Sequence, residues 1–334
     1  MNFSKNTQFL KLALIIATIS LSSCSKDDDN IDDKGITPNP VSTIDLKITT
    51  KTEEDQMGAF ADNAMALFDG KVWSIGGDNS YGGTGTHNTW TSTNGINWVS
   101  VAGPFPDFIK GHTLTTFNDQ LWLIGGENST GDPLSTIWHY DGTTWASLPA
   151  PFGNIGHHHS TVILDSKMYV IGASLTTFNT LVWSTTNGID WVEETPNAPF
   201  SGRVYHEAVA FDGFIYIIGG EDVIPSRLND IWRSSDGVNW TQVTTVPTIF
   251  SERNKFTATL YNDKVWVIAG EGDSSIHGDI WYSSDMINWT EYEDIEGDGG
   301  IHSHSTLLYN DALWVFGGYE VSGATGRVVE IKEF

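Results

Sequence analysis

The sequence predicts an all-β fold, a six-bladed propeller in which four-stranded antiparallel sheets surround an axis and an N-terminal strand closes the last blade. Two observations carry this prediction. Residues 203–243 contain two pairs of short runs rich in β-branched and aromatic side chains, and each pair is interrupted by Asp-Gly, the strongest short-range signal for a hairpin. The stretch recurs, because pairs of glycines, or of glycine and alanine, begin at residues 76, 125, 172, 219, 269 and 317, 47 to 50 residues apart.

Residues 203–243 define the strands of one blade. The first hairpin, residues 206–219, is expected to turn at Asp212-Gly213, and the second, residues 229–243, at Asp236-Gly237. Both are expected to be two-residue type I′ turns, whose central residues need positive φ. Four such strands predict one blade, and six repeats predict six blades.

Aromatic residues recur at fixed places in the repeat. One lies three residues before each pair of small residues: Trp73, Trp122, Tyr169, Tyr216, Trp266 and Trp314. Tryptophans also recur in the third strands (Trp90, Trp138, Trp183, Trp232 and Trp281) and in the fourth (Trp98, Trp145, Trp191, Trp240 and Trp289). Such regular placement indicates packing between blades. Because all fourteen tryptophans occupy these places, none is expected to remain for a ligand-binding surface.

The sixth repeat is incomplete, which predicts how the propeller closes. After Gly318 it offers one further strand, residues 327–334, so its fourth strand is missing. Residues 44–50 precede the first blade and alternate apolar and polar side chains, as a strand with one buried face does. We expect this segment to be the outer strand of the last blade, where it would cover an edge otherwise prone to aggregation.

The chain begins with features of an exported lipoprotein. Residues 1–23 combine two lysines, a short apolar run and small residues at the end, which is typical of a signal peptide and too short for a membrane span. The Leu-Ser-Ser-Cys sequence resembles the lipobox of bacterial lipoproteins, which implies cleavage before Cys24 and lipidation of this sole cysteine. Residues 24–41 are polar and acidic and predict a flexible tether, and the propeller is expected to span residues 42–334.

Charge and the residues after Cys24 indicate location and exclude one class of partner. Ser-Lys-Asp-Asp-Asp resembles the export signal of surface-exposed lipoproteins of some Gram-negative bacteria, which implies a lipid anchor in the outer membrane and an outward-facing domain. A net charge of −25 repels nucleic acid and anionic membrane surfaces, so nucleic-acid binding is excluded. We expect a monomer whose partner is a protein or glycan at the cell surface.

The repeat resembles the kelch repeat, and the predicted domain is similar to six-bladed propellers of the galactose oxidase/kelch superfamily. The resemblance rests on the glycine pairs, the aromatic residue before them (Tyr216), the histidine opening the first strand (His206) and the late tryptophan (Trp232), with a pitch of about 50 residues. It covers residues 42–334. It implies the fold and no single function, because kelch propellers include binding scaffolds, oxidases and sugar epimerases.

Two activities of similar propellers do not fit the sequence. The copper site of galactose oxidase requires a cysteine bonded to a tyrosine, and Cys24 is assigned to the lipid, so copper oxidase chemistry is excluded and no cofactor is expected. Residues 234–240 resemble the Asp-box of sialidases but are one residue shorter between Asp and Gly. A hairpin turn with a packing tryptophan accounts for them. No Ser-His-Asp spacing, phosphate-binding loop or HExxH motif is present.

Histidines recur at one place in the repeat. His112, His159, His206 and His304 lie thirteen residues before the small pairs, where the other two repeats have Asn63 and Phe256. The favoured interpretation is a consensus histidine that holds a loop by hydrogen bonds. His157 and His302 lie two residues earlier, and with His158 they suggest a zinc or nickel site, but their blades would be opposite one another. No metal site is therefore predicted.

Loops after the small pairs and before the first strands are expected to open on one face. Acidic and basic residues gather there, as a polar-ligand site requires, although any solvated loop face has them too. The candidate ligand-binding residues are Lys110, Arg203, His206, Glu221, Arg253, Glu271, His302 and Tyr319.

Two function classes follow. The first is a non-catalytic, surface-tethered propeller that binds a protein or glycan, with specificity set by the variable loops 82–88, 129–134 and 223–228. The second is a sugar-active enzyme resembling the kelch-type sialic acid mutarotases. In that class Glu221 or Glu271 would act as acid or base, and Arg203 or Arg253 would hold the substrate carboxylate.

Overall fold

The computed structural model describes residues 44–53, 57–78, 88–103, 108–152, 157–174, 176–222, 226–246, 249–295 and 299–334. The predicted signal peptide, Cys24 and the tether lie outside the described residues, as do most of the loop 82–88 and residues 223–225. Among the described residues, the structure has no helix long and apolar enough to cross a bilayer.

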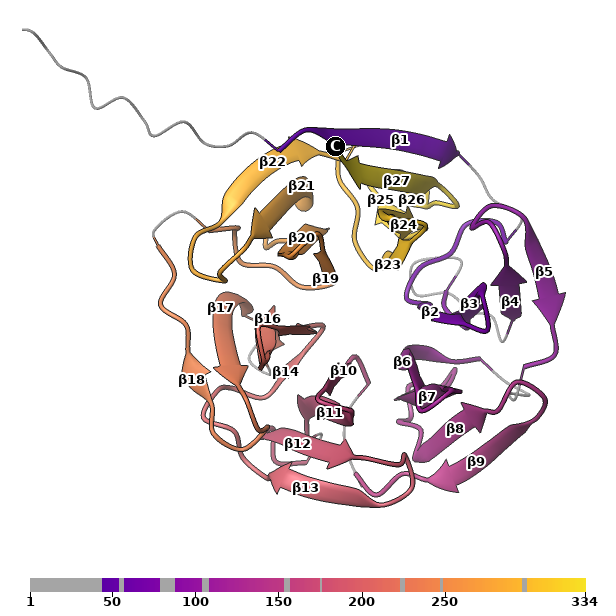
Figure 1. The fold of residues 1–334 in the computed structure, drawn as a ribbon, viewed down its shortest axis with the longest axis vertical. Coiled ribbons are helices and arrows are strands. Elements are labelled where there is room, and N and C mark those ends of the chain that lie inside the picture. Colours follow the sequence, from indigo (N-terminus) through magenta and orange to yellow (C-terminus); the bar gives the residue numbers. More distant parts are fainter. Residues whose placement is uncertain are drawn as a thin grey trace, which may run out of the picture. The chain divides into compact units, whose positions relative to one another are not determined.

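Six antiparallel sheets surround an axis, which confirms the predicted all-β, six-bladed propeller (Figure 1). Blades one to three follow one another in the chain. They consist of β2 (Ala64–Phe68), β3 (Lys71–Ile75), β4 (Thr89–Ser92) and β5 (Trp98–Val101); β6 (Lys110–Phe117), β7 (Gln120–Glu127), β8 (Thr136–Tyr140) and β9 (Trp145–Pro149); and β10 (Ser160–Leu164), β11 (Lys167–Ala173), β12 (Thr180–Thr185) and β13 (Trp191–Thr195).

Blades four to six complete the circle. They consist of β14 (Arg203–Val204), β15 (Glu207–Phe211), β16 (Phe214–Asp222), β17 (Arg227–Ser234) and β18 (Thr241–Gln242); β19 (Thr257–Tyr261), β20 (Lys264–Glu271), β21 (Ile276–Ser283) and β22 (Thr290–Asp294); and β23 (Ser305–Tyr309), β24 (Ala312–Phe316), β27 (Val328–Glu333) and β1 (Leu46–Thr52). A small hairpin, β25 (Tyr319–Glu320) and β26 (Gly323–Ala324), extends from the last blade.

The N-terminal strand closes the propeller as predicted. β1 pairs antiparallel with β27 at the outer edge of blade six, with Leu46 opposite Glu333 and Ile48 opposite Ile331 (Figure 1). Leu46 and Ile331 are buried with residues of blade five. The two ends of the propeller are therefore joined by backbone hydrogen bonds and by a shared hydrophobic core.

Aromatic side chains fill the spaces between blades. Six clusters of buried hydrophobic residues make up the core, and Trp122 and Trp266 are fully buried in two of them. The indole N–H of Trp122 donates to the carbonyl oxygen of Phe117 at 2.9 Å, and Trp266 makes the equivalent bond to Tyr261. Every tryptophan lies in the described part of the chain, and none of them is exposed.

Of the two predicted two-residue turns, the structure confirms the first and not the second. Asp212 and Gly213 both have positive φ, as a two-residue type I′ turn requires. The prediction for Asp236-Gly237 is wrong, because β17 ends at Ser234 and β18 begins only at Thr241.

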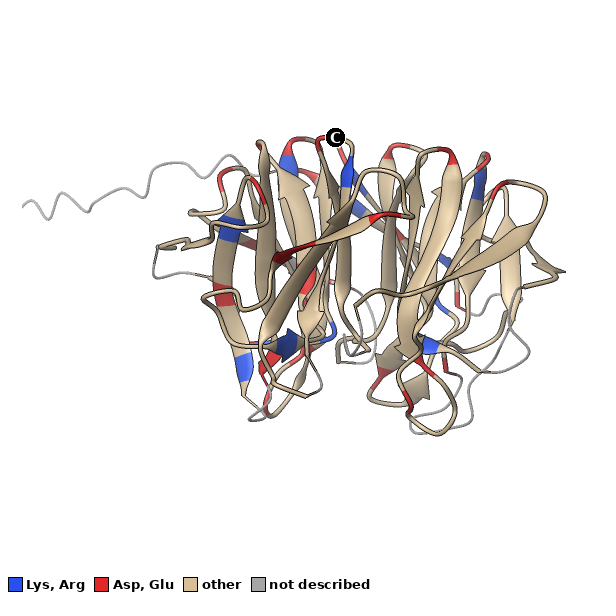
Figure 2. Ribbon diagram, turned by 90° about the horizontal axis from the view of Figure 1, so that it is seen from below, with Lys and Arg blue, Asp and Glu red and all other residues tan. Residues whose placement is uncertain are grey.

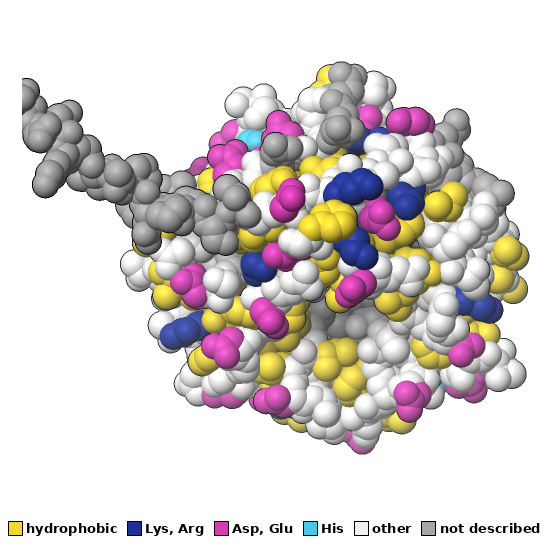
Figure 3. All heavy atoms as spheres, turned by 45° about the horizontal axis from the view of Figure 1, so that its top comes forward, with side chains coloured by type: hydrophobic (Ala, Val, Ile, Leu, Met, Phe, Trp, Pro, Cys, Tyr) yellow, Lys and Arg dark blue, Asp and Glu magenta, His cyan; other side chains and the backbone are white. Residues whose placement is uncertain are grey.

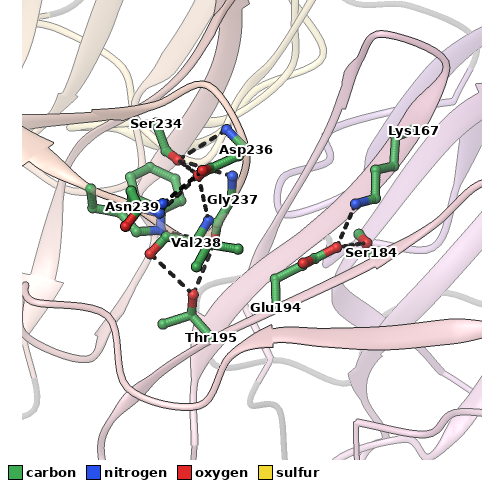
Figure 4. Close-up of polar contacts among 10 residues, drawn as sticks. Lys167, Ser184, Glu194, Thr195, Ser234, Asp236, Gly237, Val238 and Asn239 are labelled. Atoms are coloured by element: carbon green, nitrogen blue, oxygen red, sulfur yellow. Dashed lines mark hydrogen bonds and ion pairs between the residues drawn. The ribbon is translucent and has the colours of Figure 1, made fainter.

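Side chains organise this longer turn. Ser234 Oγ accepts hydrogen bonds from the backbone N–H groups of Asp236 and Gly237, and the Asp236 carboxylate accepts from those of Val238 and Asn239 (Figure 4). Burial opposes charge on Asp236, but these hydrogen bonds hold its pKa well below the usual range. A local side-chain network thus replaces the two-residue backbone turn.

The same turn links neighbouring blades. The hydroxyl of Thr195, on β13, donates to the carbonyl oxygen of Gly237 at 3.0 Å (Figure 4). A Cβ placed on Gly237 would lie 2.6 Å from the ring of Tyr169 in the preceding blade. This turn therefore covers an aromatic residue of the neighbouring blade.

Charged residues lie mainly on the connections between strands. Figure 2 shows Asp and Glu concentrated at the two ends of the blades, and Figure 3 shows acidic and basic side chains interspersed on the visible side. The blade faces, in contrast, are buried against one another. The excess of acidic residues is thus carried by solvated loops and needs no ligand to explain it.

Deleting residues 44–52 should destabilise the propeller, because blade six would lose its outer strand and the core would lose Leu46 and Ile48. Burial of two such side chains is worth about 3 to 6 kcal/mol, which corresponds to a fall in melting temperature of roughly 10 °C. Calorimetry checks this, with deletion of residues 1–43 as the control that leaves β1 in place. Equal melting temperatures for the two truncations would contradict it.

Candidate functional site

The candidate site is a cavity on the axis of the propeller. It has a volume of about 250 Å³ and is bounded by the first strands of all six blades and the residues just before them. Hydroxyl groups of neighbouring blades meet in its wall, with 2.6 Å between the Oγ1 atoms of Thr113 and Thr161 and 2.7 Å between those of Thr257 and Thr306. The wall is therefore polar and hydrogen-bonded within itself.

In each blade, one residue that lines the cavity has a left-handed backbone conformation. Four of these six residues directly precede the recurring histidines, and the other two precede Asn63 and Phe256; their φ values lie between 53° and 63°. Backbone bonds join them from blade to blade, for example from the N–H of Tyr205 to the oxygen of His158 and from the N–H of Ser303 to the oxygen of Lys255. We call this set the left-handed ring: Asp62, Gly111, His158, Tyr205, Lys255 and Ser303.

The backbone of the left-handed ring is uniform, and its side chains are all different. A left-handed conformation costs a non-glycine residue about 1 to 2 kcal/mol, yet five of the six residues are not glycine. Backbone strain of this kind concentrates at functional sites. The side chains retained here are therefore candidates for ligand recognition.

Three members of the ring form one cluster. The rings of His158 and Tyr205 stack with centroids 3.9 Å apart, and Lys255 Nζ lies 5.2 Å from the Tyr205 centroid. Lys255 also binds Glu271 at 2.7 Å. Burial, reinforced by nearby carboxylates including Asp62, raises the pKa of Tyr205. The phenol thus remains a hydrogen-bond donor over the physiological pH range, beside an aromatic face and a cation.

Asp62 faces this cluster from blade one. Burial raises the pKa of its carboxyl group, against the opposing effect of a hydrogen bond from Ser303. The ring thus presents a carboxyl group, a hydroxyl, a phenol, an imidazole and an ammonium group to one small space.

Glu207 is a second acidic group in the wall, on β15. The equivalent places in the other blades hold Ala64, Thr113, Ser160, Thr257 and Ser305, so it is the one ionisable residue at this level. The carboxyl group of Glu207 has no hydrogen-bond or ionic partner among the described residues, and burial raises its pKa to about 8. A carboxyl group that titrates near neutral pH is suited to proton transfer.

Glycine pairs allow the blades to approach the axis closely. A Cβ on Gly125, the first of its pair, would lie 2.6 Å from Cε1 of His159 in the next blade. A Cβ on Gly126, the second, would lie 2.7 Å from the carbonyl oxygen of Lys110 and 2.8 Å from Cβ of His112 in its own blade. Both glycines also have positive φ. The pair is therefore required by space and by backbone conformation.

The histidines at the predicted recurring place are buried against these glycines. Burial lowers the pKa of His112, His206 and His304 to about 3, so their rings are uncharged at neutral pH. Phe256 occupies the same place in blade five. His206, a candidate ligand-binding residue, thus borders the cavity as a neutral ring packed between blades.

The structure places neither predicted arginine in the cavity wall. Arg203 and Arg253 are 1% and 0% exposed. Arg203 forms a two-bond ion pair with Asp230 and donates to the carbonyl oxygen of Gly219, and Arg253 does the same with Asp279 and Ala269. Both guanidinium groups hold their own blades together and have no free side to offer a carboxylate.

Three predicted residues lie close to the ring without lining the cavity. Glu271 binds Lys255 and also Arg227 at 2.9 Å, and these cations lower its pKa despite the opposing effect of burial. Glu221 accepts a hydrogen bond from the side-chain amide of Asn254. Lys110 Nζ lies 3.6 Å from Glu127.

The remaining two predicted residues, His302 and Tyr319, are buried together in blade six. Their ring centroids are 5.5 Å apart, and each side chain is 4% exposed. Burial and the charge of Lys255 lower the pKa of His302 to about 4. His157, its counterpart in the sequence, instead pairs with Glu127 of the adjacent blade at 3.3 Å.

The sequence contains one indication of the left-handed ring. Fourteen residues before each small pair, the six repeats have Asp, Gly, His, Tyr, Lys and Ser, all different, whereas the next position is mostly histidine. A place that varies completely between otherwise regular repeats indicates a role outside packing. None of the predicted ligand-binding residues occupies this place in the repeat.

Fold and site together define the class of protein: a six-bladed β-propeller with a polar pocket on its axis. The profile of the KLHDC2/KLHL20/DRC7 Kelch-repeats domain matches residues 156–330, and that of the DUF6242 beta propeller domain matches residues 68–235. The first match spans more than half of the chain, and the protein therefore belongs to the Kelch-repeat family.

A solved structure of YjhT is similar to this chain in fold. The two are 17% identical with a TM-score of 0.68, over 84% of this chain and 96% of YjhT. No curated protein matches the chain in sequence. Because 499 chains of solved structures match the fold, this likeness does not select a function.

Replacing Gly126 by alanine should destabilise the protein much more than replacing Gly142. The two glycines have nearly equal φ values, 92° and 94°, but a Cβ on Gly142 meets no atom within 4 Å. Because only the Cβ of Gly126→Ala clashes with other atoms, this variant should have a free energy of unfolding about 1 to 3 kcal/mol lower than that of Gly142→Ala. Urea unfolding of both variants measures this difference. Equal losses would show that backbone conformation alone requires the glycine.

Glu207→Gln should stabilise the protein at alkaline pH. The pKa of Glu207 is raised in the folded state, so its contribution to stability is present below about 4.5, its ordinary value, and is lost as pH rises to about 8. Glu207→Gln has no carboxyl group to ionise, so it does not lose this stability as the pH rises. Its melting temperature should match that of the wild type near pH 4 and exceed it increasingly up to pH 8. A difference that does not change with pH would contradict the assignment.

Proposed function

We propose that this propeller is a binding module that holds the end of a glycan, or a similar hydroxyl-rich ligand, in its axial cavity. The observation that carries the proposal is the left-handed ring, in which one repeated backbone geometry presents different polar side chains. A ligand rich in hydroxyl groups requires donors and acceptors in fixed positions. Asp62 and Ser303 supply acceptors, Tyr205 and Lys255 supply donors, and the Tyr205–His158 stack supplies an aromatic surface.

The dimensions and the polarity of the cavity favour a glycan over a protein partner. A volume of about 250 Å³ has room for a single sugar ring and none for a folded surface. The tryptophans, which often bind sugars on protein surfaces, are occupied by packing between blades. The axial cavity is thus the place where an aromatic ring and unlike polar groups meet.

The proposal includes attachment to the cell envelope. Its support is the sequence of residues 1–29, in which Cys24 follows a lipobox-like sequence and an acidic stretch comes directly after it. A tether of this kind would hold a monomeric propeller at the outer surface of the outer membrane, where glycans are present.

A second candidate function, catalysis on a sugar, is favoured by Glu207. Its raised pKa near 8 suits a group that gives and takes a proton at neutral pH. The cavity places it among hydroxyl groups and uncharged histidines.

Tyr205→Ala and Lys255→Met should each abolish ligand binding. We would measure melting curves of the purified protein with neutral, amino and acidic monosaccharides, including sialic acids. A ligand at one hundred times its dissociation constant adds about 2.7 kcal/mol to stability. Phe178→Ala is the control, because Phe178 is exposed and lies outside the cavity wall.

Two outcomes would contradict the binding proposal: no stabilisation by any sugar, or a stabilisation that survives Tyr205→Ala. The catalytic alternative has its own readout. Exchange between the anomers of the bound sugar, followed by NMR, should be accelerated by the wild type and not by Glu207→Gln. Binding without acceleration would leave the propeller a binding module.

A further inference from the structure

We propose that Glu127, His157 and His158 form a binding site for a divalent transition metal, of which zinc is the best fit, at the rim of the axial cavity. The site comprises the last residue of β7 and two consecutive residues ahead of β10, so it joins blades two and three. It involves no residue of the opposite blade and does not depend on the glycan proposal.

The ligand atoms are already close to one another. One atom from each of the three side chains lies within 4.8 Å of the others. Glu127 Oε2 is 3.3 Å from His157 Nε2, and the rings of His157 and His158 are perpendicular with centroids 4.7 Å apart. Ligands of a tetrahedral zinc ion are about 3.4 Å apart, given zinc–ligand distances of about 2.1 Å. Small side-chain rotations would therefore complete the set.

The backbone explains why two consecutive histidines share one site. His158 belongs to the left-handed ring, with φ of 58°. Its N–H donates to the oxygen of Gly111 at 2.7 Å, which anchors this turn to blade two. In an extended strand, neighbouring side chains point to opposite faces, and a left-handed residue interrupts that alternation. His157 is therefore directed toward Glu127 instead of away from it.

The surroundings of Glu127 and His157 favour a bound cation at this place. Glu127 is 9% exposed, and its other oxygen, Oε1, lies 3.6 Å from Lys110 Nζ. His157 Nδ1 is buried without a hydrogen-bond partner among the described residues, so the ion pair of Nε2 with Glu127 is the polar contact of this imidazole that the structure shows. Lys110 thus orients the carboxylate from behind, while its positive charge opposes a bound cation.

The donor set identifies the class of metal. Two imidazole nitrogens and one carboxylate oxygen suit zinc and neighbouring divalent transition metals, and they suit calcium poorly because calcium prefers oxygen ligands. Three protein ligands leave a position for water or for a ligand oxygen, as in catalytic zinc sites. Because His158 also lines the cavity and stacks on Tyr205, a metal here would border the bound ligand.

Titration calorimetry of the chelator-treated full-length protein with Zn²⁺ tests the proposal. We expect one zinc per chain and no binding of Ca²⁺. Glu127→Gln and His157→Asn should each weaken zinc binding at least about 100-fold, since even outer partners of metal ligands cost 10- to 100-fold. His302→Asn is the matched control, because His302 is at the same place in the repeat of blade six.

Lys110→Met should change the zinc affinity in the opposite direction. Removing the cation beside Glu127 should tighten zinc binding severalfold, whereas a role for these residues in folding alone would not change metal affinity. Unchanged melting temperatures would show that Glu127→Gln and His157→Asn are folded. Co²⁺ in place of Zn²⁺ should give visible absorption typical of four or five ligands with nitrogen among them.

Three results would overturn the proposal. They are a wild-type protein that takes up no zinc, zinc uptake unaffected by Glu127→Gln and His157→Asn, and an equal loss of affinity in His302→Asn. None of these measurements involves a sugar, so they are independent of whether the cavity binds one.

Discussion

The rest of this structure depends on one constraint: the backbone of the glycine pairs lies very close to the recurring histidines at the start of the first strands. The first glycine of a pair makes room for the neighbouring blade, as Gly125 does for His159, and the second for its own, as Gly126 does for His112. Contacts of this kind recur in other blades, as at Gly76 and Gly220, and they help to set the distance of the first strands from the axis. The cavity owes its present size to residues no larger than alanine at these places.

The same contacts separate structural from variable positions. The histidines packed on the glycines are uncharged and repeat from blade to blade, whereas the residue just before each of them turns inward and differs in every blade. The same left-handed backbone conformation thus recurs in all six blades and carries a different side chain in each. Recognition by repeated propellers can change at these positions while the packing of the blades stays the same.

The fold could be predicted from the sequence because its determinants are periodic. Glycine pairs, aromatic residues and the missing last strand identify the blades and their closure. The second Asp-Gly turn was predicted wrongly because Asp236 bonds the backbone N–H groups of Val238 and Asn239 and forms a longer loop. Site prediction relied on charge in loops, and this led to Arg203 and Arg253, whose partners Asp230 and Asp279 are distant in sequence. Tyr205 and Lys255 were missed because a left-handed turn, invisible to alternation rules, directs them inward.

The pairing of β1 with β27 also determines when this protein can finish folding. Leu46 lies opposite Glu333, so the first strand of the propeller has no partner until the last residues of the chain are available. Five blades have all their own strands earlier, but contacts between residues this far apart in sequence form slowly. During synthesis the first strand must therefore remain unpaired. The polar residues that alternate along β1, among them Lys47, disfavour pairing of this exposed strand with other chains.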